Sequence, residues 1–203
     1  MPKTIFSYPN IIGISGAARS GKDTLCRALQ RQFLKKDILA VRKSIAGDTV
    51  KADLQELIER KFNLDSFTEK NDEKEFMRPI LVEYGKMQRA KTQGRYFIER
   101  FEQEQNTINI LPDIRYVEYP KDEVQWLKNE VGGFLIFVER DGIYDANDTE
   151  KVNNKIIRNL ADYTVRWSSL SENIPHENEQ IDQHAHRVIS WMTTIYQLDK
   201  QQP

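Results

Sequence analysis

The sequence predicts an α/β fold in which helices cover both faces of a parallel, five-stranded sheet. Short apolar runs rich in β-branched residues alternate with longer stretches of helical spacing, which is the pattern of a parallel sheet wrapped by helices. A glycine-bounded loop follows the first apolar run and leads directly into a helical stretch. With 203 residues, the chain can form one such domain with a sizeable core. We therefore expect residues 1–203 to form a single domain.

Five apolar runs are the expected strands. They cover residues 11–15, 39–45, 107–112, 134–139 and 163–167. The first helix is expected to begin at the glycine-bounded loop, and the last at about Glu179. Each has apolar residues on one face, which predicts packing against the sheet. These faces carry Leu25, Leu29 and Phe33 in the first helix, and Ile181, Ala185, Val188, Ile189, Met192 and Ile195 in the last. Residues 199–203 are expected to be a frayed tail.

Two further segments are expected to serve the substrates. Residues 53–62, 69–90 and 94–105 have helical spacing and lie between the second and third expected strands. This block, about 48–106, is the candidate substrate-binding insert. A polar stretch follows the fourth strand, and we expect its residues, about 141–158, to form a short mobile lid.

Composition and charge exclude several classes of partner. Lys and Arg number 30 and Asp and Glu 31, so the formal net charge is −1 and predicts neither nucleic-acid nor anionic-membrane binding. No apolar stretch approaches the length of about 18 residues that spans a membrane. One cysteine, Cys26, excludes an internal disulfide framework and suits a reducing compartment. We expect a cytoplasmic protein that is a monomer or a homodimer.

The glycine-bounded loop is the strongest functional signal. Its pattern is Gly16-x4-Gly21-Lys22, and it lies between a buried strand and a helix, as a phosphate-binding loop requires. Glycine permits the torsions that turn successive N–H groups toward phosphate oxygens, and the helix N-terminus adds partial positive charge. Lys22 then brings a full charge to the β- and γ-phosphates. The expected ATP-binding residues are Gly16, Ala17, Ala18, Arg19, Ser20, Gly21, Lys22, Asp23 and Thr24. The alternative is a plain strand-turn-helix corner.

Two carboxylates are candidates for a magnesium site. Asp23 stands where Ser or Thr usually contacts the metal, and it can hold Mg²⁺ through water or pair with a nearby basic group. Asp113 follows the third strand, where the carboxyl end of a strand opens onto the ligand crevice. It can face magnesium through water or orient an acceptor phosphate, and Arg115 can reach an anionic substrate. Alternatively, Asp113 caps a turn and Arg115 forms a surface ion pair.

The acids that follow Arg115 are expected to be exposed. Glu118, Asp122 and Glu123 precede a helical stretch, where carboxylates are favoured by the helix dipole alone.

Basic residues in the insert and the lid are candidates for holding phosphate. Arg78 and Arg89 are eleven residues apart, about three helical turns, so they share a face of one helix. Their guanidinium groups can each grip a phosphate, and Gln88 can contact a base or sugar. The alternative is a solvated basic face. Arg140, at the end of the fourth strand, is the first candidate for stabilising the transferring phosphoryl group. Arg158 and Arg166 are weaker candidates.

Together these motifs resemble those of the phage-type deoxynucleoside monophosphate kinases. The resemblance rests on Gly16-x4-Gly21-Lys22-Asp23-Thr24, Arg78 with Gly85 and Arg89, Asp113-Ile114-Arg115-Tyr116, and Gly132-Gly133-Phe134 in a strand that ends in Arg140. It covers most of the chain from Ile11 to about Arg140. It implies a P-loop kinase fold in which Lys22 holds donor phosphates and Arg78 and Arg89 hold the acceptor nucleotide. It also implies that Asp113 lies near magnesium and Arg140 near the transferring group.

The leading hypothesis is therefore Mg²⁺-dependent transfer of the γ-phosphoryl group of ATP to a (deoxy)nucleoside monophosphate. Lys22, Asp113 and Arg140 are its expected catalytic residues. The same groups would serve a kinase of another small phosphorylated metabolite. A third possibility is a regulator that binds ATP without turning it over.

Overall fold

A parallel five-stranded sheet forms the centre of the computed structural model, which describes residues 8–145, 147–168, 170 and 172–199. The strands are β1 (Ile11–Ser15), β2 (Ala40–Arg42), β3 (Ile108–Leu111), β4 (Phe134–Arg140) and β5 (Tyr163–Trp167). Their order is β2-β3-β1-β4-β5, and every neighbouring pair is parallel. The predicted fold class is confirmed. Strand β2 is shorter than predicted because the chain beyond Lys43 turns away from β3 toward Asp113.

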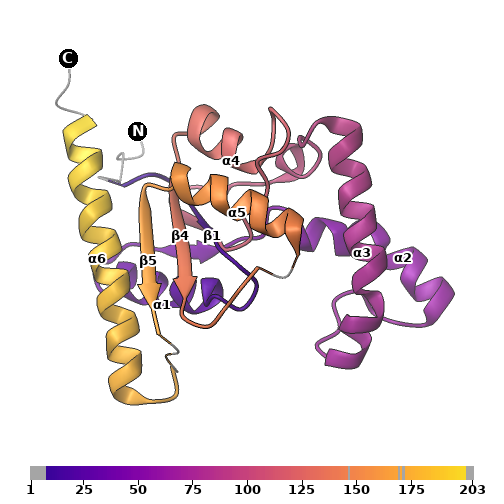
Figure 1. Cartoon of the computed structure of the whole chain (residues 1–203), viewed down its shortest axis with the longest axis horizontal. Helices are drawn as coiled ribbons and strands as arrows, with labels where there is room; N and C mark the ends of the chain where they lie inside the picture. The colour runs from indigo at the N-terminus through magenta and orange to yellow at the C-terminus, as the bar shows by residue number, and fades with distance from the viewer. Residues whose placement is uncertain (1–7, 146, 169, 171, 200–203) are drawn as a thin grey trace.

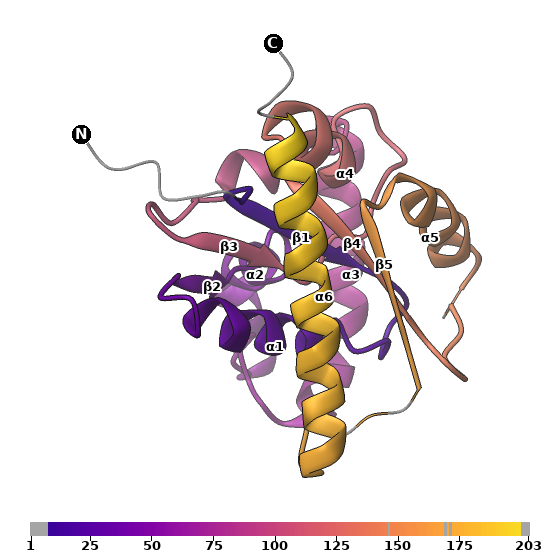
Figure 2. The ribbon, with the colours of Figure 1, turned by 90° about the vertical axis from the view of Figure 1, so that its left-hand side faces the viewer.

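Two helices cover one face of the sheet. These are α1 (Lys22–Leu34) and α6 (Pro175–Asp199), and Figure 2 shows α6 lying across the strands. The predicted apolar faces of both helices are buried against the sheet, except that Ile195 is only partly buried. Helix α6 begins at Pro175, earlier than predicted, where proline suits a first turn because its missing N–H has no partner there. Asp199, the first residue of the predicted tail, is the last residue of α6, and the rest of that tail, 200–203, lies outside the described residues.

Shorter helices cover the opposite face. They are α4 (Glu123–Gln125), the π-helical turn η2 (Trp126–Glu130) and α5 (Asp148–Leu160). In Figure 1, α5 ends near the start of β5, and its last turn overlaps the upper end of β4. Close packing depends on Gly13 of β1, since a Cβ there would lie 2.4 Å from a methyl group of Leu127. The sheet is thus covered on both faces, as predicted.

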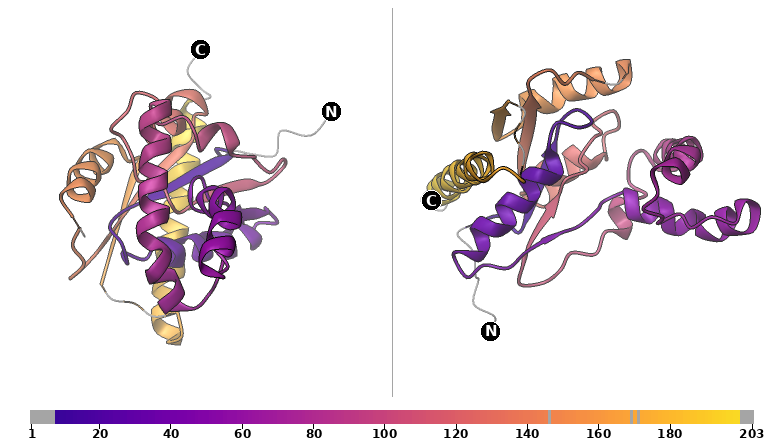
Figure 3. Two further views of the ribbon diagram at one scale, coloured as in Figure 1. Left: turned by 90° about the vertical axis from the view of Figure 1, so that its right-hand side faces the viewer. Right: turned by 90° about the horizontal axis from the view of Figure 1, so that it is seen from below.

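The insert stands beside the sheet with its own small core. Helices α2 (Gly47–Phe62) and α3 (Asn71–Thr92) lie to one side of the strands (Figure 3), around buried Leu54, Ile58 and Met77. The predicted helix at 94–105 is wrong, because only the 3₁₀ turn η1 (Ile98–Arg100) forms there. Left-handed torsions at Gln93 and Gly94 end α3 and redirect the chain. Among the described helices, none is long and apolar enough to cross a membrane.

Candidate active site

The glycine-bounded loop, residues 16–22, is called the phosphate loop below for its predicted role. It needs glycine at both ends for steric reasons as well as torsional ones. Gly16 and Gly21 have φ angles of 139° and 98°, which side chains with a Cβ rarely adopt. A Cβ on Gly16 would lie 2.3 Å from the carbonyl oxygen of Val138, and one on Gly21 would lie 2.6 Å from Cζ2 of Trp167. The loop therefore packs directly on the carboxyl ends of β4 and β5.

The lysine amine lies over this loop. Lys22 Nζ donates hydrogen bonds of 2.7 Å to the carbonyl oxygens of Gly16 and Ala17. Burial, followed by the positive charge of Arg115, lowers the pKa of Lys22 to about 8. Strand β3, which Arg115 follows, pairs in parallel with β1, which leads into the loop. The residues after β3 therefore lie beside the phosphate loop.

The rest of the loop has its own polar contacts. The Ala18 amide donates to Glu150 Oε1 at 3.0 Å, and the Arg19 carbonyl accepts from Arg140 Nη1 at 3.4 Å. Two buried hydroxyls, of Ser15 and Ser20, have no hydrogen-bond partner in the described part of the chain. The Ala18 amide and the Arg140 guanidinium are therefore already positioned at the loop, where an anion could contact them.

Asp23 has a basic partner in the structure. Its Oδ1 accepts a hydrogen bond of 3.1 Å from Arg42 Nε, and its side chain is more than half exposed. This is the basic-group contact that the sequence left open as an alternative. The magnesium contact predicted for Asp23 stays a prediction.

Asp113 caps the turn between β2 and α2. Its Oδ2 accepts from Ser44 Oγ at 2.7 Å and from the Ile45 and Ala46 amides at 3.0 Å and 3.3 Å. Its Oδ1 also accepts from the Ile45 amide, at 3.2 Å. The carboxylate thus holds the start of the insert beside the end of β3. Its predicted contact with magnesium is untested.

Arg89 forms a buried ion pair with Asp122. The arginine is 4% exposed and Asp122 is fully buried, with Nη2 lying 2.8 Å from Oδ2 and 2.9 Å from Oδ1. The Tyr116 ring lies 3.3 Å from the guanidinium carbon. The prediction that Asp122 is exposed is therefore wrong. Its partner, Arg89 on α3, is 33 residues away in the sequence, so no local pattern reveals the pair. All hydrogen bonds of Arg89 to the described residues come from Nε and Nη2, which leaves the Nη1 edge for a ligand.

Glu123 is a second buried acid that the sequence misplaced at the surface. It is 2% exposed, and its Oε2 accepts from the Arg115 amide at 2.7 Å and the Tyr116 amide at 3.2 Å. Burial raises the pKa of its carboxyl to about 8. Glu123 thereby fixes the backbone that carries Arg115.

A cavity of about 210 Å³ lies between the insert and the end of β3. Three predicted site residues line it: Arg89, Asp113 and Arg115. Its other lining residues include Lys51, Tyr116 and Glu123, which were not among the predicted site residues, and the apolar Val50, Leu81, Val82 and Phe97. The cavity therefore combines a charged end with an apolar wall.

Two predicted substrate residues do not line this cavity. Arg78 is exposed and pairs with Glu75 at 2.8 Å, and Gln88 is partly exposed. Eleven residues of helix advance by about 16 Å along the axis, so Arg78 shares a face with Arg89 but lies far along it. Substrate contacts of Arg78 and Gln88 stay predictions.

A larger cavity, about 660 Å³, lies between the phosphate loop, the end of β4 and α5. It is lined by Ala17 and Ser20 of the loop and by Arg140, Lys151, Lys155 and Arg158. Arg158 and Arg166 both pair with Glu139, at 2.7 Å and 2.5 Å. The predicted lid arginine, Arg140, thus lies beside the loop, while the two weaker candidates bind an acid of β4.

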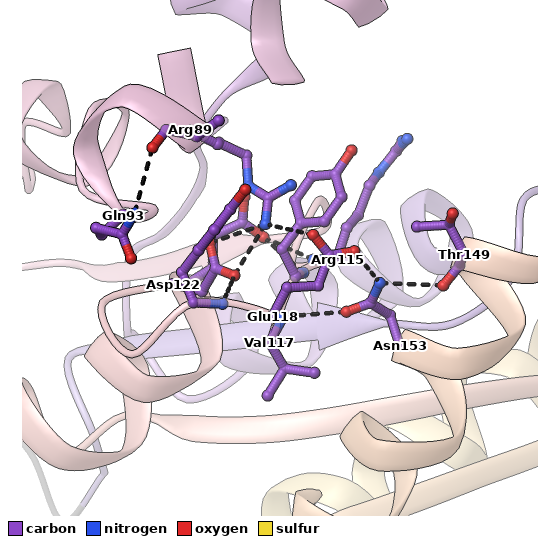
Figure 4. A network of polar contacts seen from close by, with 12 residues as sticks. Arg89, Gln93, Arg115, Val117, Glu118, Asp122, Thr149 and Asn153 are labelled. Atoms are coloured by element: carbon purple, nitrogen blue, oxygen red, sulfur yellow. Dashed lines mark hydrogen bonds and ion pairs between the residues drawn. The ribbon is translucent and has the colours of Figure 1, made fainter. Parts of the chain in front are cut away.

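A polar network joins the insert to α5 (Figure 4). Asn153 of α5 accepts from the Val117 amide at 3.1 Å and donates to Glu118 Oε1 at 2.8 Å. Glu118 Oε2 in turn lies 3.5 Å from Arg89 Nη2. Val117 and Glu118 therefore connect Arg89, which lines the small cavity, to α5, which borders the large cavity.

Comparisons with known proteins give only a distant likeness of fold. No family model matches the chain, and no curated protein matches it. A mutant of the APS kinase CysC from Mycobacterium tuberculosis superimposes with a TM-score of 0.42 at 15% identity, covering 91% of this chain and 96% of that one. Dephospho-CoA kinase from Campylobacter jejuni gives a TM-score of 0.41 at 9% identity, covering 91% and 98%. Neither likeness is close enough to assign an activity.

Proposed function

We propose that this protein is an ATP-dependent phosphotransferase whose acceptor is a (deoxy)nucleoside monophosphate. One observation carries the proposal: the phosphate loop and Arg115 of the small cavity follow the neighbouring parallel strands β1 and β3, and Arg115 is close enough to Lys22 to lower its pKa. A loop suited to the donor phosphates thus adjoins a cavity suited to a phosphorylated acceptor. This adjacency is the arrangement that phosphoryl transfer requires, since most of its catalysis is positioning and charge stabilisation.

Each side of this arrangement has a distinct role in the proposal. The loop amides and Lys22 hold the donor phosphates, and Arg140 approaches them from the lid side. Arg115 and the free edge of Arg89 hold the acceptor phosphate, while the apolar wall of the cavity takes the rest of the acceptor. Asp122 keeps Arg89 in place, and Glu123 keeps the Arg115 backbone in place.

The carboxylates present fit magnesium that arrives with the nucleotide. No group of three or more His, Cys, Asp or Glu residues within the described chain could form a metal cage. Mg²⁺ bound with ATP needs only one or two carboxylates, often through water, besides the phosphates. Asp23, exposed at the loop, and Asp113, at the cavity, are the residues that would hold it. Bound there, Mg²⁺ would neutralise charge on the donor phosphates.

A non-catalytic ATP-binding regulator is the second candidate. The observation in its favour is that both carboxylates already have protein partners: Asp23 pairs with Arg42, and Asp113 binds the turn at 44–46. A kinase of another small phosphorylated metabolite is compatible with the same cavity, whose volume is only about 210 Å³.

ADP production with ATP and Mg²⁺ separates these functions when a panel of ribo- and deoxyribonucleoside monophosphates is supplied. We expect turnover that depends on one or more acceptors and is abolished by Lys22→Ala. Lys36→Ala, the same change in the exposed turn after α1, should leave turnover unchanged. Lys22-dependent ATP binding without turnover on any acceptor supports the regulator or another acceptor class, and a protein that binds no ATP contradicts the proposal.

Substitutions in the small cavity test the acceptor site. Arg115→Ala should raise the acceptor KM at least tenfold, on the order of the value of a charged hydrogen bond, with little change in ATP affinity. Arg78→Ala makes the same charge change outside the cavity. An acceptor KM unchanged by Arg78→Ala would remove Arg78 from the site, and one unchanged by Arg115→Ala would contradict the assignment of this cavity.

A further inference from the structure

The phosphate loop already holds an anion that belongs to the protein. Glu150 Oε1 accepts the Ala18 amide hydrogen bond at 3.0 Å, across 132 residues of sequence. Ala18 is one of the loop residues whose N–H groups are expected to face a phosphate oxygen. A carboxylate oxygen there occupies the place of a ligand oxygen, because both are anionic acceptors of the same donor.

The electrostatics of Lys22 agree with this position. The charge of Glu150 is the largest of those that raise the pKa of Lys22, ahead of Asp23 and Asp113. The lysine amine is meanwhile bound to two loop carbonyls. Glu150 therefore acts on both components of the loop: it binds one amide and faces the lysine charge.

Helix α5 holds Glu150 in this place. Asn147 caps the helix by accepting the Glu150 amide at 2.9 Å. One turn later, Asn153 is anchored to the segment after Arg115 through Val117 and Glu118 (Figure 4). The glutamate is thus fixed at both ends of the first turn of α5. Lys151 and Lys155 of the same helix line the large cavity beside the loop.

We propose that Glu150 is a built-in placeholder that occupies the phosphate loop until donor phosphates displace it. The inference rests on the proposed function, since it assigns the loop to a phosphate donor. Displacement releases the carboxylate from the Ala18 amide and lets the start of α5 move. The lysines that follow Glu150 can then approach the bound phosphates, so that an acid leaves the loop as basic groups arrive. Nucleotide binding is thereby coupled to the position of α5.

Affinity measurements with a matched control test this proposal. The probes are pyrophosphate and ATP, titrated calorimetrically into the wild type, Glu150→Gln and Asp148→Asn. Asp148 is an exposed acid in the same helical turn, so Asp148→Asn makes the same charge change without touching the loop. We expect Glu150→Gln to bind both probes about three- to tenfold more tightly, as removal of one exposed charged hydrogen bond predicts. Asp148→Asn should change affinity less than about twofold.

The contact itself is visible without a ligand. The Ala18 amide resonance should shift in Glu150→Gln and not in Asp148→Asn, and pyrophosphate should shift it in the wild type. Melting curves of the three proteins confirm that each is folded.

The outcomes separate this inference from the proposed function. If pyrophosphate binds in a Lys22-dependent way and Glu150→Gln binds it no more tightly than the wild type, only the placeholder is contradicted. If Glu150→Gln and Asp148→Asn bind the probes equally more tightly than the wild type, the gain comes from net charge alone, and the placeholder role of Glu150 is also contradicted. If neither the wild type nor Glu150→Gln binds pyrophosphate or ATP, both proposals are overturned.

Discussion

The indole Nε1 of Trp167 donates a hydrogen bond of 2.9 Å to the carbonyl oxygen of Ser20. The last residue of β5 therefore holds the loop that follows β1, although the two residues are 147 positions apart. The ring also fills the space beside Gly21. The shape of the phosphate loop thus depends on the far edge of the sheet as well as on its own glycines.

Gly21→Ala should distort the loop. The new Cβ would meet the Trp167 ring at 2.6 Å, and φ at this position is 98°. We expect a loss of unfolding free energy of at least about 2 kcal/mol, from torsional strain and steric overlap together. Urea denaturation measures it. Gly132→Ala is the control, because Gly132 also has a positive φ but nothing lies within 4 Å of an added Cβ. Equal losses in the two variants would mean that Trp167 does not constrain the loop.

Asp122→Ala should be strongly destabilising. It leaves the Arg89 guanidinium, 4% exposed, without its fully buried partner. Breaking one side of a buried ion pair costs about 3–5 kcal/mol, which urea denaturation can resolve. Glu75→Ala is the control, because it breaks the exposed ion pair with Arg78 on α3, the helix that also carries Arg89. It should lower the free energy of unfolding by less than about 1 kcal/mol. A small loss from Asp122→Ala would show that Arg89 finds water or another acid.

Glu123 should make the protein less stable as pH rises. Burial raises the pKa of its carboxyl to about 8 in the folded protein, against 4.5 when exposed. The folded state therefore binds an extra proton between these values, and its stabilisation is lost as pH rises toward 8. Glu123→Gln cannot ionise, so its stability relative to the wild type should increase by roughly 3 kcal/mol from pH 5 to pH 8.

Urea denaturation at pH 5, 6, 7 and 8 measures this difference. Glu56→Gln, at an exposed position of α2, should show no such trend. A constant difference between Glu123→Gln and the wild type would mean that Glu123 ionises normally.

Nucleotide binding should take up a proton at alkaline pH. Burial lowers the pKa of Lys22 to about 8 in the free protein, and donor phosphates beside the amine would raise it again. Affinity should therefore fall as pH rises above 8, and binding at pH 9 should take up a fraction of one proton. Calorimetry of ATP binding in two buffers of different ionisation enthalpy measures this uptake. Its absence in the wild type, or its persistence in Lys22→Arg, would contradict the role of Lys22.

Apolar spacing and the glycine pattern correctly predicted several helices and strands, because these elements are determined by residues close together in the sequence. Strand β5 has the predicted bounds, and the apolar faces of α1 and α6 are those expected. The phosphate loop was recognisable because strand, glycines, lysine and helix are contiguous. The helix expected at 94–105 failed because the left-handed turn at Gln93 and Gly94 and the burial of Phe97 outweigh local spacing.

The sequence by itself determined the fold class and singled out the glycine-bounded loop. It also named Arg89, Asp113 and Arg115, from helical spacing and from a strand end, and the structure places all three around one cavity. Only the tertiary structure decided which groups the charged side chains of the site pair with. Arg89 is paired with Asp122, Asp113 caps the start of α2, and Glu150 binds the Ala18 amide. Their partners are far away in the chain, and the strength of each contact depends on burial, which no local spacing encodes.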